Sequence, residues 1–311
     1  MSSGIWSNAT SVANFIFISM QSVSDSTGNI PDPAPKPSAL RVAILRAAHQ
    51  ILDVPVVFED AFALRILGVA EQDSLRSDPW RYNTPRLRGL RASVVVRSRM
   101  AEEEWVRSKE CGVRQYVILG AGLDTFGYRN QDHDRSRIFE VDLPAMQQWK
   151  RNCLRVAGIK EPASVTYAAV DFERSTLDEG LKQAAFCRSE PAFFSWLGVT
   201  MYLEEGAVMN TLRFIASLAP GGGVVFDYGV LPGLLSPVER SRMEFLAARV
   251  AEHGEGWKAY FDPSYLVAAL RSLGFGEVED FGPERLNERY LAGRTDGLRK
   301  SGVSRLICAR I

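Results

Sequence analysis

Two glycines and an acid carry the first chemical signal in the sequence. Gly120 and Gly122 follow an apolar, β-branched run, Gln115–Leu119. Asp142 closes a second such run and lies 20 positions beyond Gly122. Glycine permits φ > 0 and lets a ligand lie against the backbone. A strand, a glycine turn and an acid about 20 residues later are typical of the nucleotide-binding half of a doubly wound α/β sheet. The acid is then expected to accept hydrogen bonds from ribose hydroxyls.

The turn departs from the dinucleotide pattern. Thr125 replaces the third glycine of G-x-G-x-x-G, and Asp124 stands directly before it. That glycine lets the following helix hold a pyrophosphate, whereas an aspartate at a helix start accepts the free N–H groups itself and repels phosphate. Glu140, Asp142 and Asp171 are expected to add negative charge along the same strand ends. These features favour a cofactor that has no phosphate and carries positive charge, and S-adenosylmethionine fits this description.

Two residues after a third apolar run are candidates for the adenine site. Asp171 and Phe172 follow Val165–Val170. Asp171 is expected to accept a hydrogen bond from the adenine amino group, and the backbone N–H of Phe172 to donate one to a ring nitrogen. The alternative for Asp171 is a simple helix N-cap.

The remaining elements alternate as in an α/β fold, behind a block of helices. The expected helices of this block are Leu40–Gln50, Phe58–Leu67 and Arg91–Lys109, with Gly68–Pro85 as a polar connection. The expected strands are Gln115–Leu119, Ile138–Val141, Val165–Val170, Ala192–Leu197, Val224–Tyr228, Phe275–Asp280 and Ser304–Ala309. The expected core helices are Pro144–Ala157, Leu177–Ala185, Gly206–Leu218 and Pro263–Leu273.

Composition shifts predict the domain organisation. Residues 1–38 are rich in serine, asparagine and proline, which predicts a disordered leader; a helix over the active site and a second start at Met20 are alternatives. Residues 39–311 are expected to form one domain, with an N-terminal helical cap (39–112) and a Rossmann-like core (113–311). Segment 229–260 interrupts the core with a charged helix, Val238–Glu252. Ligands bind at the carboxyl ends of strands, so this insertion is a candidate substrate lid.

Composition also bounds the partners. The chain has 37 basic and 37 acidic residues, which gives no electrostatic reason to expect nucleic acid or an anionic membrane. Its apolar runs are shorter than the ~20 residues that span a bilayer, and no basic region of a signal peptide is present. We therefore expect a cytoplasmic protein with a small-molecule substrate; the oligomeric state stays open.

The four cysteines are widely spaced, which predicts neither a metal site nor a disulfide framework. They are Cys111, Cys153, Cys187 and Cys308, and Cys308 is expected in the core.

Two longer strings, VILGAGLDTFGYR and FEVDLP, resemble the leucine carboxyl methyltransferase family of class I methyltransferases. The likeness runs from about Leu40 to the C-terminus and is greater to the bacterial and fungal branch that includes polyketide-type O-methyltransferases. It implies a seven-stranded Rossmann-like sheet with helical lid segments and S-adenosyl-L-methionine as cofactor. It also implies methyl transfer to an oxygen of a small molecule, in secondary metabolism. The string VDF at 170–172 matches the family's adenine-binding position.

The resemblance also assigns the amino-acid end of the cofactor. Arg97 matches a family arginine that binds the cofactor's carboxylate, which a guanidinium can hold with two parallel hydrogen bonds. Arg99 and a solvated helix arginine are the alternatives. In more distant members strand four ends in a glutamate that takes the ammonium, but Leu197 stands there in this chain. The ammonium is then expected to meet backbone carbonyls near Gly120 or Trp196, or another acid.

Candidates for the substrate site come from the cap and the strand ends. Arg46 and His49 lie three apart, hence on one helix face, and could meet a substrate carboxylate or phenol. The alternative is a surface pair. Trp196, Tyr202 and Tyr228 could line an aromatic pocket, with plain core as the alternative.

The nucleophile decides whether a base is needed. A carboxylate, with a pKa near ~4, needs none, whereas a phenol or alcohol benefits from one, and His49 or His253 is the candidate. No committed base is evident, so no catalytic residue is assigned and carboxyl methylation is favoured.

Two rival functions remain. The missing third glycine and Asp124 argue against a nicotinamide-dependent oxidoreductase; Leu197 keeps open a catalytically inactive binding protein.

Overall fold

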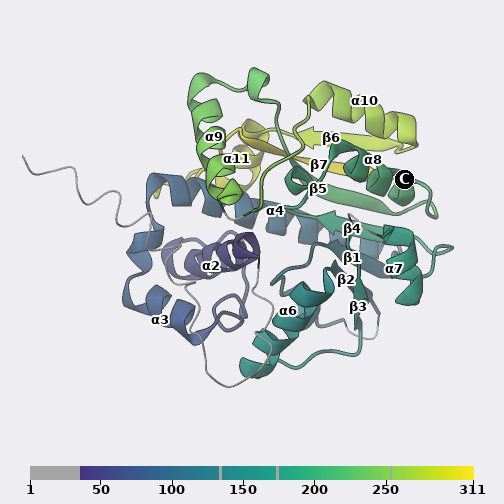
Figure 1. Cartoon of the computed structure of the whole chain (residues 1–311), viewed down its shortest axis with the longest axis horizontal. Helices are drawn as coiled ribbons and strands as arrows, with labels where there is room; N and C mark the ends of the chain where they lie inside the picture. Colours follow the sequence, from purple (N-terminus) through teal and green to yellow (C-terminus); the bar gives the residue numbers. More distant parts are fainter. Residues whose placement is uncertain (1–35, 133–134, 173–174, 253) are drawn as a thin grey trace, which may run out of the picture. The chain divides into compact units, whose positions relative to one another are not determined.

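Seven strands form one twisted sheet at the centre of the chain. The structure, a computed structural model, describes residues 36–132, 135–172, 175–252 and 254–311 (Figure 1). The sheet order is β3-β2-β1-β4-β5-β7-β6, with β1 to β5 parallel and β7 antiparallel to both of its neighbours. The strands are β1 (Gln115–Leu119), β2 (Arg137–Asp142), β3 (Val165–Ala169), β4 (Ala192–Trp196), β5 (Gly223–Gly229), β6 (Glu277–Phe281) and β7 (Ser304–Arg310). The predicted doubly wound α/β sheet is confirmed, and every expected strand is present within two residues at each end.

The strand order reverses at β1, which lies between β2 and β4. Leu119, the last residue of β1, pairs with Val141 on one side and Trp196 on the other. The segments that leave these three strands therefore begin side by side. In open α/β sheets a ligand binds in the crevice at such a reversal.

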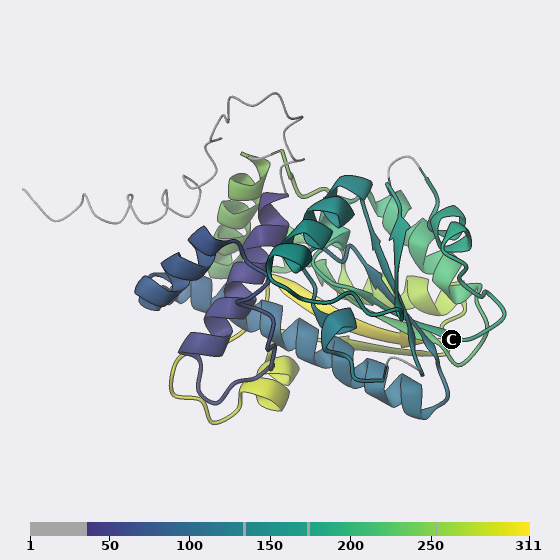
Figure 2. The ribbon, with the colours of Figure 1, turned by 90° about the horizontal axis from the view of Figure 1, so that it is seen from below.

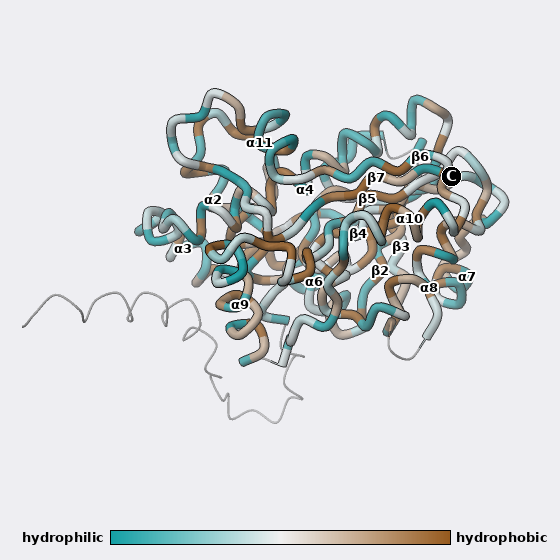
Figure 3. Tube along the Cα trace, turned by 90° about the horizontal axis from the view of Figure 1, so that it is seen from above, coloured by the Kyte–Doolittle hydropathy of each residue, from teal (hydrophilic) through white to brown (hydrophobic). Residues whose placement is uncertain are grey.

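Helices cover both faces of the sheet (Figures 1 and 2). Successive strand residues face opposite sides, so Val117 and Leu119 join one apolar core while Tyr116 and Ile118 join the other. The helices are α2 (Pro37–Leu52), α3 (Val69–Ser77), α4 (Pro85–Glu110), α5 (Phe126–Arg129), α6 (Pro144–Val156), α7 (Leu177–Gln183), α8 (Glu205–Ala216), α9 (Pro237–Ala251), α10 (Pro263–Leu273) and α11 (Pro283–Leu291). Figure 3 shows the resulting contrast between hydrophobic strands and more hydrophilic outer helices.

Helix α4 links the sheet to the cap. Thr84 accepts a hydrogen bond from Leu87 N (3.4 Å), and Pro85 occupies the first helical turn, so the start is well defined. At 26 residues the helix spans about 39 Å, more than the sheet needs. Its later part packs on the sheet, where Trp105 stacks on Tyr116 with ring centroids 4.8 Å apart. Its earlier part is free to border a ligand site.

The cap differs from the sequence prediction in two places. Residues 58–67 form turns rather than a helix, and the expected polar connection contains α3 and a short 3-10 helix, Pro79–Tyr82. Side chains explain the first difference. Gln50 bonds to Phe58 O (2.9 Å) and Asp60 N (3.1 Å), while Asp60 accepts from Phe62 N (3.0 Å). Such side-chain bonds compete with helical ones. Helix α11 was also not predicted.

Some predictions concern residues outside the described ranges. Residues 1–35, which hold most of the predicted leader and Met20, are among them, and α2 begins at Pro37. The proposed boundaries at 38 and 112 therefore stay predictions. Cys308 is buried in the core as expected. Across the described ranges, each helix is too short or too polar to cross a membrane.

Candidate functional site

A cavity of about 1590 Å³ opens where the parallel strands end. Typical small-molecule sites measure about 300–1,000 Å³, so this cavity has room for two ligands side by side. Its floor is formed by residues that follow β1 to β4 or end β5. They are Gly120–Asp124, Asp142, Leu143, Val170, Asp171, Phe172, Leu197, Gly198, Val199 and Asp227. The cavity thus lies at the strand-order reversal.

The glycine turn after β1 adopts a backbone that other residues rarely accept. Gly120 and Gly122 have φ of 65° and 45°. A Cβ at Gly120 would overlap Val199 Cγ2, so this turn packs directly against the turn that follows β4. The predicted φ > 0 is confirmed at both glycines, and at Gly120 the packing also excludes a side chain. Close approach of a ligand to this backbone stays a prediction.

Asp142 faces the glycine turn, as the 20-residue spacing predicted. Its Oδ2 accepts from Gly122 N at 2.7 Å and its Oδ1 from Leu143 N at 2.8 Å. Burial raises the pKa of Asp142, although these two backbone hydrogen bonds act to lower it. The carboxylate lines the cavity and keeps lone pairs for further donors, which suits ribose hydroxyls.

Replacing Asp142 with alanine is expected to weaken the binding of S-adenosylhomocysteine by about 1–3 kcal/mol, because a charged acceptor is lost. Isothermal titration calorimetry measures this change. Asp178→Ala is the matched control, since Asp178 forms an exposed ion pair with Arg188 (2.6 Å) outside the cavity lining. Equal affinities for the Asp142 variant and the control would contradict the assignment.

The adenine candidates follow β3, which is separated by β2 from the strand that leads into the glycine turn. Asp171 and Phe172 both line it, and the Phe172 ring stacks on Trp196 with centroids 6.3 Å apart. The N-cap alternative for Asp171 is wrong, because Thr176 caps α7 and forms a capping box with Glu179. Asp171 instead joins Ser175 through its backbone: Ser175 N donates to Asp171 O at 2.8 Å.

Arg97 lines the cavity and Arg99 does not. Arg97 Nη1 donates to Asp227 Oδ2 at 2.8 Å, and its side chain is 12% exposed. Gly198 N donates to the other oxygen, Asp227 Oδ1, at 2.5 Å. Arg99 is exposed and bonds to Glu103 Oε1 at 2.6 Å. Asp227 was missed by the sequence prediction, although it lies near the end of a predicted strand, as the other candidate acids do.

Arg46 belongs to a buried network, and the predicted surface pair is wrong. Its guanidinium donates to Asp60, to Thr125 Oγ1 (2.8 Å) and to Asp124 Oδ2 (3.3 Å). Burial would lower the pKa of Arg46, but the charges of Asp60 and Asp124 outweigh it and raise the pKa. Asp124 also caps Phe126 N at 2.7 Å, as predicted. Arg46 borders the cavity and donates to these partners through Nη1 and Nη2, whereas its Nε is buried without a hydrogen-bond partner among the described residues. Its charge offsets much of the negative charge of Asp124.

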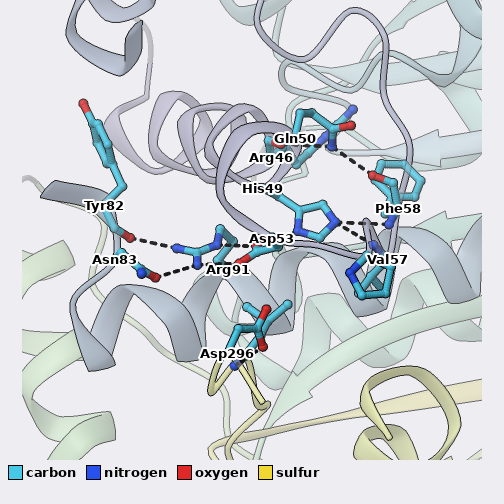
Figure 4. Close-up of polar contacts among 12 residues, drawn as sticks. Arg46, His49, Gln50, Asp53, Val57, Phe58, Tyr82, Asn83, Arg91 and Asp296 are labelled. Carbon is cyan, nitrogen blue, oxygen red and sulfur yellow. Dashed lines mark hydrogen bonds and ion pairs between the residues drawn. The ribbon is translucent and has the colours of Figure 1, made fainter. Parts of the chain in front are cut away.

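His49 is the candidate that the structure places elsewhere. It is fully buried and absent from the cavity lining, with Nδ1 2.7 Å from Asp53 Oδ2 (Figure 4). Its Nε2 accepts from Val57 N (2.9 Å) and Phe58 N (3.2 Å). The prediction of a substrate ligand or base is wrong, because both ring nitrogens serve the fold. His253 lies outside the described residues.

Glu140 does not add charge to the strand ends, contrary to the prediction. It is fully buried, absent from the cavity lining, and paired with Lys150 Nζ at 2.7 Å. Tyr128 OH also donates to its Oε2 at 3.2 Å. The acids that do border the cavity near the strand ends are Glu102, Asp124, Asp142, Asp171 and Asp227.

Of the three predicted pocket aromatics, Tyr202 alone lines the cavity. Trp196 and Tyr228 are fully buried, so the core alternative is confirmed for them. Burial raises the pKa of Tyr202, which keeps its phenol neutral at ordinary pH. Leu197, at the end of β4, lines the cavity with an apolar side chain.

One part of this cavity, named here the second compartment, is lined by the cap, by segment 229–260 and by residues 283–304. Val230 and Phe261 form a bridge that closes the ends of this insertion, and α9 within it lines the cavity. Ser38 at the start of α2 bonds to Glu255 through its backbone N (3.0 Å) and Oγ (2.8 Å), so α2 and the end of the insertion lie side by side (Figure 2). Whether the insertion moves as a lid stays a prediction.

Positive charge dominates this second compartment. Its cationic lining residues are Arg41, Arg86, Arg88, Arg242, Arg299 and Lys300, and its acids are Glu239, Glu255 and Glu284. Glu239 accepts from Gly302 N at 2.8 Å. Desolvation lowers the pKa of buried Lys300 to about 8, and its Nζ donates to Ser301 O (3.2 Å) and Ser304. Within the described ranges, no carboxylate forms an ion pair with Arg86, Arg242 or Arg299.

Comparisons with known proteins agree with this geometry. Residues 39–216 match the leucine carboxyl methyltransferase family. The chain is 30% identical over 290 residues to YktD of Bacillus subtilis, named as an S-adenosyl-L-methionine-dependent methyltransferase; the match covers 84% of this chain and 93% of that protein. A Mycobacteroides abscessus protein with the same enzyme name is 31% identical over 207 residues, or 66% and 68% of the two chains.

Solved structures share the fold. A crystal structure from Thermobifida fusca, described as a methyltransferase, superposes with a TM-score of 0.52 at 18% identity and covers 93% of this chain and 99% of that one. A Streptomyces avermitilis protein superposes with a TM-score of 0.53 at 13% identity, covering 91% and 99%. At these identities the likeness supports the fold alone.

Proposed function

Because the chain belongs to the leucine carboxyl methyltransferase family, whose cofactor is S-adenosylmethionine, we propose that it is a cytoplasmic O-methyltransferase acting on a small acidic molecule. The S-adenosylmethionine-dependent methyltransferase activity is the premise. The oxygen acceptor, its size and its charge are the proposal. Composition supports the cytoplasmic setting, and the likeness to the polyketide-type branch supports a place in secondary metabolism.

The residues at the strand ends fit this cofactor. The glycine turn lines the cavity beside Asp142. Asp142 keeps two lone pairs beyond its bonds to Gly122 N and Leu143 N, and these suit a ribose diol. Asp171 and Phe172 border the place expected for the adenine, and Arg97 borders the place expected for the cofactor's carboxylate. When bound, the cofactor supplies an electrophilic methyl group on a sulfonium, which leaves as a neutral thioether.

The cationic second compartment is the observation that carries the proposal. Six cations against three acids attract an anion and steer it toward the cofactor end of the cavity. Arg86 stacks on Phe245, with its guanidinium carbon 4.0 Å from the ring centroid, so an aromatic surface lies beside the charge. Arg88 Nε is buried and has no hydrogen-bond partner in the part of the chain that the structure describes, which leaves a donor for an acceptor oxygen. An aromatic or similarly flat carboxylic acid matches this lining.

The proposal favours a carboxylate over a phenol as the reacting oxygen. A carboxylate is ionised at neutral pH and needs no base. Tyr202, which lines the cavity, has a raised pKa because it is buried, so it is a poor base but a competent donor. The protein's task is then to hold the acid, exclude water and align the oxygen with the methyl group.

A labelling experiment tests the acceptor class. The protein is incubated with methyl-labelled S-adenosylmethionine and a cell extract passed through an ultrafilter that removes macromolecules. We expect label in a small product that releases methanol in mild base, as a methyl ester does. Label in a base-stable product would move the assignment to a hydroxyl oxygen. Label only with the retained proteins of an unfiltered extract would contradict the small-molecule acceptor.

The double variant Arg242→Gln/Arg299→Gln tests the compartment itself. It is expected to lower methyl transfer to the labelled acceptor by about tenfold or more, since two charge-assisted contacts are lost, while the affinity for S-adenosylhomocysteine stays unchanged. Arg285→Gln is the matched control, because Arg285 is exposed, pairs with Glu279 (2.9 Å) and lies outside the cavity lining. Transfer that is unaffected in the double variant would remove the support for an anionic acceptor.

A further inference from the structure

The wall of the cavity beside β4 and β5 carries a buried ion pair, Arg97–Asp227. The two side chains are 12% and 4% exposed, and both line the cavity. The amino-acid end of S-adenosylmethionine is a zwitterion, with an ammonium and a carboxylate on one carbon. We propose that Arg97 and Asp227 bind this zwitterion together, with Asp227 accepting hydrogen bonds from the ammonium.

The order of the strands places this pair at the correct end of the cofactor. Asp171 follows β3 and Asp142 ends β2, so the adenosine lies over that side of the sheet. The chain of the amino acid then extends past β1 toward β4. The turn after β4 carries Gly198, whose N–H bonds to Asp227 at 2.5 Å, and Val199, which packs on Gly120. Asp227 therefore lies one strand beyond the turn that the methionine end reaches.

Asp227 has room for the ammonium. Among the described residues, Asp227 Oδ2 accepts one hydrogen bond from Arg97 and Oδ1 accepts one from Gly198, whereas a carboxylate offers about four lone-pair sites. Its own backbone is fixed as well, since Thr200 Oγ1 donates to Asp227 O at 2.6 Å. Lys300, the other cation near this carboxylate, directs its N–H groups at Ser301 and Ser304. The ammonium would thus face little competition for Asp227.

The neighbouring acids are less suited. Asp124 is joined to Arg46 and caps a helix, and Glu102 is joined to Arg129. Since the ammonium and carboxylate of an amino acid share one carbon, the acid must lie beside the guanidinium that takes the carboxylate. Within the described residues, Asp227 is the acid that bonds to Arg97. This arrangement also accounts for the apolar Leu197 at the end of β4, because a second acid is not needed there.

Four ligands measure the contributions of the ammonium and of the carboxylate to binding separately. They are S-adenosylhomocysteine, its deaminated analogue, its decarboxylated analogue and methylthioadenosine, which lacks the amino acid. Binding to the wild-type chain, Asp227→Asn and Arg97→Met is measured by calorimetry. Methylthioadenosine serves as the matched control, since it reads the adenosine site and the fold without the amino acid.

The expected pattern is selective for charge. Asp227→Asn should weaken S-adenosylhomocysteine and the decarboxylated amine by about tenfold or more, and leave the deaminated acid and methylthioadenosine nearly unchanged. Arg97→Met should weaken the two ligands that keep a carboxylate. If Asp227→Asn weakens the deaminated acid and spares the amine, Asp227 only positions Arg97, and the proposal is overturned.

The wild-type chain provides a test that does not depend on any variant. The deaminated analogue should bind at least about tenfold more weakly than S-adenosylhomocysteine, because its ammonium is missing. Equal affinities would overturn the proposal even if Asp227→Asn fails to fold. If no adenosine ligand binds, the fault lies with the cofactor assignment itself rather than with Asp227.

Discussion

Replacing Asp53 with alanine is expected to lower the free energy of unfolding by about 3–5 kcal/mol, because it leaves a buried guanidinium without its counter-charge. Arg91 is fully buried and donates to Asp53 through Nε (2.6 Å) and Nη2 (2.8 Å). His49 adds a third contact to Asp53, while Tyr82 O accepts from Arg91 Nη1 and Asn83 Oδ1 accepts from Arg91 Nη2 (Figure 4). Urea unfolding of the two chains measures the difference.

A surface pair gives the matched comparison for Asp53. Glu161 pairs with Arg151 at 3.2 Å, and both side chains are partly exposed. Glu161→Ala should change stability by about 0–1 kcal/mol. The double variant Asp53→Ala/Arg91→Met should regain part of the lost stability, because the unpaired charge goes with its partner. A loss for Asp53→Ala as small as that for Glu161→Ala would show that the cap does not depend on this cluster.

The same cluster predicts a dependence on acid. Burial alone would raise the pKa of Asp53, but hydrogen bonds from His49 and Arg91 outweigh it and lower the pKa. A carboxyl group with a lowered pKa in the folded chain contributes stability above its unfolded pKa. That contribution disappears as the pH falls through the folded value. The Asp53 variant should therefore lose less stability on acidification than the wild-type chain.

The second large effect is expected for Gly120→Ala, which should lower stability by about 2–5 kcal/mol. A left-handed backbone costs an alanine about 1–2 kcal/mol, and overpacking costs about 1–3 kcal/mol more. Both apply here, because φ is 65° and the new methyl group would overlap Val199 Cγ2. The turn also borders Asp142, so affinity for S-adenosylhomocysteine should fall in parallel. Thermal unfolding and calorimetry measure the two losses.

Two controls separate strain from overlap at Gly120. Gly112→Ala imposes the backbone strain alone, since φ is 94° and no atom lies within 4 Å of its Cβ position. Adding Val199→Ala to Gly120→Ala removes the overlap and leaves the strain. We expect both controls to fall between the wild-type chain and Gly120→Ala. A Gly120→Ala chain with unchanged stability and affinity would mean that the two turns do not pack as described.

The sheet could be predicted from the sequence because its signals are local. Most strands are short apolar runs, although β6 (EVEDF) has three acids. The ligand candidates follow from the rule that parallel strands end at one edge of the sheet. Asp142, Asp171 and Arg97 were found in this way or through the family likeness. Asp227 obeys the same rule and was overlooked, because it is followed by Tyr228 and Gly229 within the strand.

The cap could not be predicted as well, since its contacts join distant residues. Arg46 and His49 look like a polar pair on one helix face, but their partners Asp60, Thr125 and Asp53 lie up to 79 positions away. Glu140 was similarly predicted to add charge at a strand end, but in the folded chain it forms a buried ion pair with Lys150. Charge near a motif does not show whether that charge is already paired in the folded chain.

The walls of the second compartment come largely from the last third of the sequence. Arg242, Arg299 and Lys300 lie beyond residue 216, where the family match ends, while the candidate cofactor residues other than Asp227 lie within it. Selection can therefore alter which acid is accepted by changing α9 or residues 297–304 without disturbing how the methyl donor is held. A graft of these two segments between related enzymes is the natural route to new acceptors.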